Sequence, residues 1–123
     1  MRRKIALGLA LALSLAATPA LAGSGSFSGA SGHVTKGTAT VTKSGGKITV
    51  KLGSNFKLDG APDPYVALGN GSAPVKGGLL AVLRKNSGSQ SYSIAASPAL
   101  DGARQVIIWC KRYAVPLGVA TIK

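Results

Sequence analysis

The sequence predicts an all-β protein, a single small β-sandwich or barrel of about seven to eight short, mainly antiparallel strands. Short runs of β-branched and aromatic residues alternate with polar residues, which is typical of half-buried strands. Clusters of Gly, Pro, Asn and Asp separate these runs at close spacing, as in sandwiches and barrels. No sustained helical period occurs after residue 22, so a helical fold is disfavoured.

Residues 1–22 are expected to form a secretory signal peptide and to take no part in the fold. Basic residues at positions 2–4 precede an apolar run from Ile5 to Leu15, and Ala20-Leu21-Ala22 supplies a small-x-small cleavage site. The apolar run is short for a membrane span, and no longer one follows it. The expected product is therefore a periplasmic or extracellular protein whose single domain covers residues 23–123, with no membrane span after signal removal.

The charge of the chain is strongly positive. Its 15 Lys and Arg against 3 acidic residues give a formal net charge of +12. Removing the three basic residues of the signal leaves 12 against 3, or about +9 for the secreted basic protein. Such a charge favours anionic surfaces and partners. Export, together with few aromatic residues among the basic ones, argues against nucleic acid as the partner.

The first half of the domain predicts a hairpin after a flexible start. Gly23 to Gly32 is small and flexible in composition apart from Phe27, which is expected to dock on the core. His33 to Lys43 and Lys47 to Leu52 have strand composition, and Ser44-Gly45-Gly46 provides the turn between them.

Three lysines on this hairpin are candidates for anion binding: Lys43, Lys47 and Lys51. In the second strand, the lysines point outward as Ile48, Val50 and Leu52 point inward. One interpretation is a solvated face that discourages edge-to-edge aggregation. The alternative function is a non-catalytic β-sandwich that binds an anionic polymer or an acidic partner protein at this basic face.

The middle of the chain predicts a rigid connection followed by a short strand. Asn55 to Tyr65 holds two prolines, and its Phe56 and Leu58 are expected to anchor in the core. Tyr65 to Leu68 is a short strand that ends at the turn signal Gly69-Asn70-Gly71.

Two further strands and a loop precede the most apolar stretch. Leu79 to Leu83 and Gln90 to Ala95 are the predicted strands, and Ser97 to Gly102 is a loop with room for one helical turn. Val106 to Trp109 is apolar at every position, which predicts a central strand that is buried on both faces. Pro116 and Gly118 are expected to interrupt pairing before a last strand, Val119 to Ile122.

Cys110 is the only cysteine and the main candidate for chemistry. No intrachain disulfide can form, so the thiol is sealed in the core, bridged to another molecule or kept reactive. If the strand continues, Arg112 shares the face of Cys110, and with Lys111 it would favour the reactive thiolate. The opposing interpretation is that Cys110 fills core space beside Val106 and Ile108.

Counting ligands restricts the cofactors. One His excludes a single-chain blue-copper site, and one Cys with one His gives a closed zinc site poor odds. The C-x-x-C-H motif of c-type haem is absent. Noncovalent haem with Cys110 as axial ligand remains open, as do a weak shared site and thiol chemistry without a cofactor. With no recognisable hydrolytic motif, a redox or binding module is favoured over a turnover enzyme.

The order of motifs resembles that of the DM13 domain family, over nearly all of the domain. The matching segments are Gly25-Ser26-Phe27, His33 to Val41, Asn55-Phe56, Gly60 to Asp63, Gly88 to Tyr92 and Val106 to Lys111, followed by Tyr113, Val115, Leu117-Gly118 and Ala120. The resemblance implies an extracellular β-rich module that acts in redox or electron transfer. It also implies that the family's suspected active cysteine is Cys110, and that a redox partner such as a DOMON or cytochrome protein is involved.

Overall fold

The computed structural model describes residues 22–123, so the predicted signal peptide lies outside the described residues apart from its last position. Within these residues the structure has ten strands and one short 3-10 helix. Their bounds are β1 Gly23–Gly29, β2 Thr35–Lys36, β3 Thr38–Ser44, β4 Lys47–Leu52, β5 Lys57–Leu58, β6 Pro64–Asn70, β7 Ala73–Val82, β8 Gln90–Ala95, η2 Pro98–Leu100, β9 Gln105–Cys110 and β10 Val115–Thr121. The predicted all-β class is confirmed.

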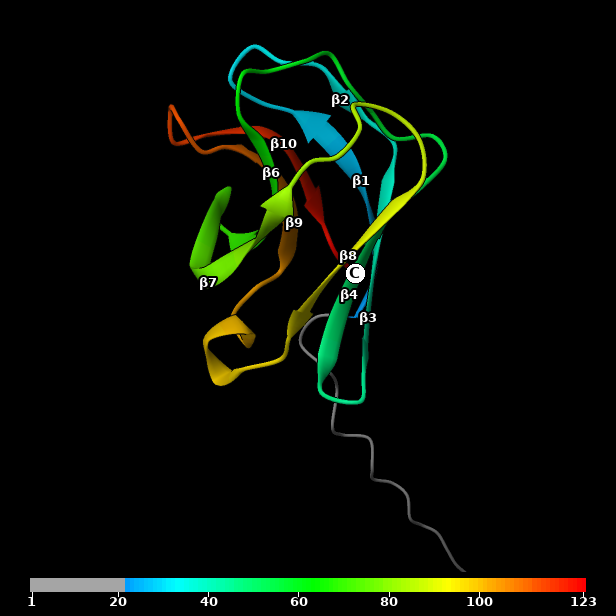
Figure 1. Ribbon diagram of the computed structural model, residues 1–123, viewed down its shortest axis with the longest axis vertical. Coiled ribbons are helices and arrows are strands. Elements are labelled where there is room, and N and C mark those ends of the chain that lie inside the picture. The colour runs from blue at the N-terminus through cyan, green and yellow to red at the C-terminus, as the bar shows by residue number, and fades with distance from the viewer. Residues whose placement is uncertain (1–21) are drawn as a thin grey trace, which may run out of the picture.

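Eight of the strands form one antiparallel sheet that is nearly closed into a barrel (Figure 1). Their order is β7-β6-β9-β10-β1-β3-β4-β8, while β2 and β5 form a separate two-stranded ribbon. A contact links β8 to the segment that follows β7, because the backbone N–H of Arg84 donates to the Tyr92 hydroxyl at 3.0 Å. The Arg84 guanidinium also lies 4.2 Å from the centroid of the Tyr92 ring.

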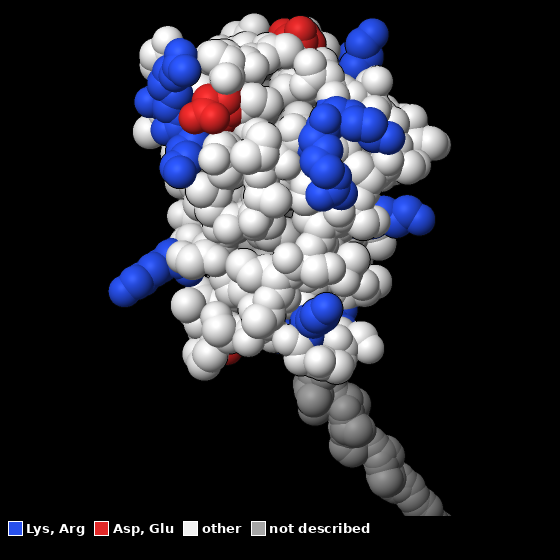
Figure 2. Space-filling view, viewed as in Figure 1, with Lys and Arg blue, Asp and Glu red and all other residues white. Residues whose placement is uncertain are grey.

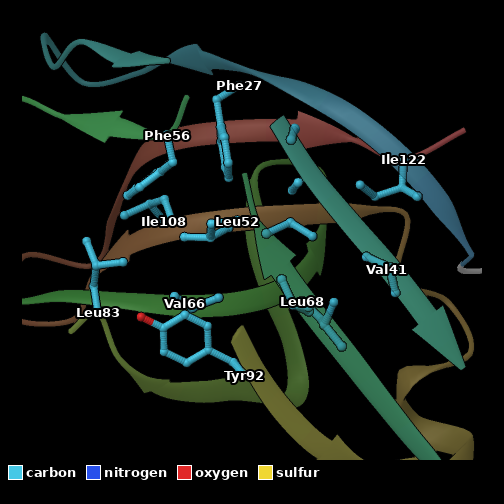
Figure 3. Packing of buried hydrophobic residues seen from close by; sticks show 14 of the residues in the cluster. Phe27, Val41, Leu52, Phe56, Val66, Leu68, Leu83, Tyr92, Ile108 and Ile122 are labelled. Atoms are coloured by element: carbon cyan, nitrogen blue, oxygen red, sulfur yellow. The ribbon is translucent and has the colours of Figure 1, made fainter. Parts of the chain in front are cut away.

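The interior of the barrel is filled by side chains from every strand of the large sheet (Figure 3). Phe27 and Phe56 meet edge to face there, with 5.5 Å between ring centroids. Phe56 and Leu58 are both buried, which confirms their predicted role as anchors. The prediction for β9 is also confirmed, since Val106, Ile107 and Ile108 are buried although they alternate between its two faces.

The expectation of a flexible start at Gly23 to Gly32 is wrong. Residues Gly23–Gly29 form β1, which pairs with both β3 and β10. The glycines have a steric purpose: a Cβ on Gly25 would lie 2.1 Å from the backbone oxygen of Thr121. The small residues therefore allow neighbouring backbones to approach closely. From composition alone, the same residues had indicated a flexible segment.

Several strand boundaries also differ from those predicted, such as that of β7, which begins at Ala73 and not at Leu79. The expected strand from His33 to Lys43 is divided at Gly37, whose φ of 103° favours glycine and turns the chain between β2 and β3. Pro116 and Gly118 do not interrupt pairing but lie within β10, at a shift of register against β9. No helix among residues 22–123 is long and apolar enough to cross a membrane.

Candidate functional site

Cys110 is the last residue of β9, a strand that lies between β6 and β10. Its neighbours across the sheet are Pro64 and Val115. The side chain shares the interior face of Val106 and Ile108, and it belongs to the hydrophobic core. It is a free cysteine with 1% of its surface exposed. The sequence left open whether the Cys110 thiol is reactive or fills core space. In the structure the thiol is sealed in the core.

The expected position of Arg112 is wrong, because β9 ends at Cys110 and residues 111–114 form a turn. Arg112 consequently does not continue the strand face of Cys110. The backbone N–H of Lys111 donates to the Asp63 carbonyl at 3.0 Å, and its ammonium lies 5.2 Å from the Tyr65 ring centroid. Within residues 22–123, no hydrogen bond or ion pair joins either cation to the thiol.

An apolar row crosses the outer face of the sheet directly beside Cys110. Cross-strand register aligns four side chains from β7, β6, β9 and β10: Val82, Tyr65, Trp109 and Pro116. Val82 is 53% exposed and the other three are partly exposed. Trp109 faces away from Cys110 because neighbouring residues of a strand point to opposite faces, but the row itself depends on long-range register and had no local signal.

The three hairpin lysines do not form one face. Lys47 and Lys51 lie on the outer side of β4, opposite Ile48 and Val50. Lys43 pairs with Ile48 and has the interior parity of β3, but it is exposed near the hairpin turn. Figure 2 shows basic side chains dispersed over one face of the molecule. Two groups of them lie at the places where Figure 1 shows the β9–β10 turn and the β7–β8 loop.

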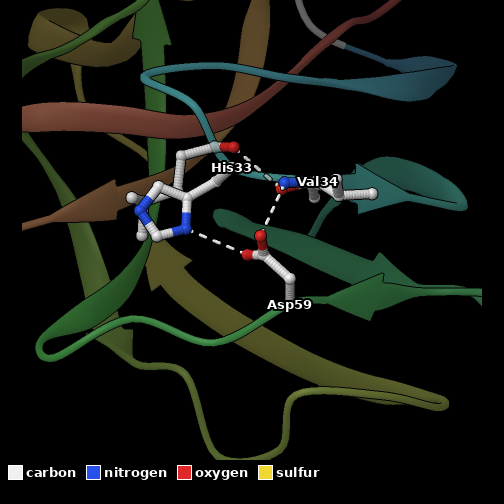
Figure 4. Close-up of polar contacts among 5 residues, drawn as sticks. His33, Val34 and Asp59 are labelled. Carbon is white, nitrogen blue, oxygen red and sulfur yellow. Dashed lines mark hydrogen bonds and ion pairs between the residues drawn. The ribbon is translucent and has the colours of Figure 1, made fainter.

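A polar cluster at the β2–β5 ribbon was not predicted as a site. His33 Nδ1 lies 2.9 Å from Asp59 Oδ1, and the backbone N–H of Val34 donates to Asp59 Oδ2 at 3.0 Å (Figure 4). The hydrogen bond from Val34, followed by that from His33, lowers the pKa of the Asp59 carboxyl below its ordinary value. No local signal could have indicated it, because β2 and β5 have only two residues each.

Beside this cluster is an open pocket of about 140 Å³, lined by Val34, Lys36, Lys57 and Asp59. Its lining holds two cations and one carboxylate. Metal binding has no comparable support, since no group of three or more His, Cys, Asp or Glu side chains within residues 22–123 is arranged to hold an ion.

These features define a class: a small all-β module with a free cysteine enclosed at the end of an inner strand. The chain belongs to the DM13 family, because the family model described as electron transfer DM13 matches residues 26–122. Comparison with curated proteins and with solved structures found no match.

Proposed function

We propose that this chain is an exported electron-transfer module in which Cys110 is the redox group. The family description as electron transfer supports the activity. The observation that carries the assignment of the residue is that the only thiol is free and ends β9, next to an exposed turn. Export is supported by the basic, apolar and small-x-small order of residues 2–22.

Burial determines how such a thiol would react. With 1% of the side chain exposed, neither a partner sulfur nor a haem iron can come within bonding distance of Cys110 in the closed fold. A haem therefore does not fit the residues as they stand. Reaction requires a local opening that uncovers the sulfur, and such openings concentrate where few buried contacts hold the chain.

The β9–β10 turn is the place where that opening would occur. Residues 111–114 are all exposed, and Cys110 with Val115 is the last register pair before them. Ala114 has a φ of 53°, a left-handed conformation that costs a non-glycine residue free energy. The turn thus has little buried surface and a strained residue, both of which lower the cost of opening it.

The redox step that a single thiol supports is exchange with a small disulfide. The Cys110 sulfur forms a new S–S bond while the bond of the small disulfide breaks. Cys110 is oxidised, and one half of the small disulfide leaves as the reduced thiol. A thiol donor reverses the step, so the protein alternates between a reduced form and a mixed disulfide.

Alkylation of Cys110 across a urea series tests the proposal. A local opening exposes little surface, so we expect slow alkylation in native buffer with a shallow dependence on urea. Redox titration with a small disulfide should give a mixed disulfide in the wild type and none in Cys110→Ala. Alkylation with the full urea dependence of global unfolding would refute the gated thiol. Redox activity that survives in Cys110→Ala would refute the assignment of the residue.

A further inference from the structure

The β2–β5 ribbon places two paired lysines, Lys36 and Lys57, in the lining of the pocket. Thr35 pairs with Leu58 and both side chains are buried, whereas Lys36 pairs with Lys57 and both are exposed. The alternation of a strand puts Val34 on the outward side with Lys36, and Asp59 on the outward side with Lys57. These are the four residues that line the pocket.

The charges of this pocket are not balanced internally. Like charges directly opposite each other on paired strands destabilise the pairing. Asp59 offsets only one of these two positive charges, and its two oxygens already accept from His33 and from the Val34 backbone N–H. Within residues 22–123, His33–Asp59 is the one ion pair, so neither Lys36 nor Lys57 has a carboxylate within 4.0 Å.

We propose that this pocket binds a tetrahedral oxyanion, a phosphate or sulfate group, between the ammonium groups of Lys36 and Lys57. Lysine is a common phosphate ligand that acts as a point charge. The pocket is open to solvent and has a volume of about 140 Å³. That is room for one such group with a short linker, and the exposed Val34 would contact the carbon of an ester.

This proposal goes beyond the redox function and does not depend on it. It also differs from non-specific attraction to the basic surface. Lys47 and Lys51 lie on the outer face of β4, separated by Thr49, and they do not line the pocket. A concave site with two cations selects an anion by position, whereas dispersed lysines attract every anion similarly.

Calorimetric titration of the purified protein with inorganic phosphate and with inorganic sulfate tests the site. The double variant Lys36→Gln/Lys57→Gln should lose about tenfold or more in affinity, because hydrogen bonds to charged groups contribute strongly. The control Lys76→Gln/Lys123→Gln removes the same total charge outside the pocket and should keep wild-type affinity. All four lysines are exposed, so both variants are expected to fold.

Two further measurements sharpen the test. Asp59→Asn removes the negative charge that lines the pocket, so it should raise the affinity for both anions. Glucose 6-phosphate and glucose 6-sulfate distinguish an ester from a free anion: tighter binding than the inorganic ion identifies the ester as the preferred form. Equal losses in the pocket and control variants, or no saturable binding of any of these ions, would overturn the proposal.

Discussion

Cys110 and Trp109 are consecutive in β9, yet their side chains lie on opposite sides of the sheet. The thiol is in the interior with 1% exposed, and the indole is on the outer face in register with Tyr65. The strand thus joins an enclosed thiol to a side chain that is partly exposed to solvent. The two residues therefore differ in solvent accessibility, and this difference can be measured.

The two side chains should respond differently to external reagents in the native state. Trp109 is the only Trp in the chain, so its fluorescence reports on one site. We expect acrylamide to quench this fluorescence in native buffer while iodoacetamide leaves Cys110 largely unmodified over the same period. Cys110→Ala serves as the control and should show the same quenching. Quenching that appears only in urea would mean that the outer row is covered.

Substitution of Cys110 should show how much a polar group at this position lowers the free energy of unfolding. Cys110→Ser inserts a hydroxyl among buried apolar side chains, and an unpaired buried hydroxyl costs about 1–3 kcal/mol. Cys110→Ala leaves a small cavity but no unpaired polar atom, so its free energy of unfolding should fall less. Urea unfolding of the three proteins measures both differences. A serine variant as stable as the wild type would show that the site is wetter than its burial indicates.

Gly25 is expected to be intolerant of a single added carbon. A Cβ at this position would lie 2.1 Å from the backbone oxygen of Thr121, so Gly25→Ala must push β1 and β10 apart. Overpacking of this kind costs about 1–3 kcal/mol. The matched control is Gly102→Ala, since no atom lies within 4 Å of its added Cβ. Thermal unfolding should separate the two variants, and equal melting temperatures would contradict the steric role of Gly25.

The sequence predicted those parts of the fold whose signal is local. The four consecutive apolar residues from Val106 to Trp109 lack the apolar–polar alternation of a half-buried strand. In the structure, β9 is indeed buried on both faces over Val106 to Ile108. Its end could not be predicted, because Lys111, Arg112, Tyr113 and Ala114 contain no glycine or proline to indicate a turn. Extending strand parity beyond Cys110 therefore gave Arg112 the wrong position.

The β2–β5 ribbon could not be predicted for a different reason. Each of its strands has two residues, which is too short for any periodicity to appear. His33 and Asp59 come together across 26 positions of sequence, and only the path of the intervening hairpin brings them close. The candidate site at Lys36 and Lys57 is thus a product of topology, whereas Cys110 was evident as the only cysteine of the chain.

The Asp59 carboxylate should make stability depend on pH at the acidic end. Its pKa is lowered by the hydrogen bonds from Val34 and His33. A carboxyl whose pKa is lower in the folded state contributes stability above its unfolded pKa of about 3.9, and that stability is lost as pH falls through the folded value. The wild type should therefore lose part of its free energy of unfolding below about pH 4.

Asp59→Asn identifies the origin of this loss, because an amide cannot titrate. The variant should be less stable than the wild type near neutral pH, and the difference between the two proteins should shrink below about pH 4. Asp101→Asn is the control: this exposed aspartate follows η2, and its replacement should preserve the wild-type profile. Urea unfolding at a series of pH values measures all three curves. A difference between wild type and Asp59→Asn that stays constant down to the lowest pH would show that the carboxylate does not stabilise the ribbon through its charge.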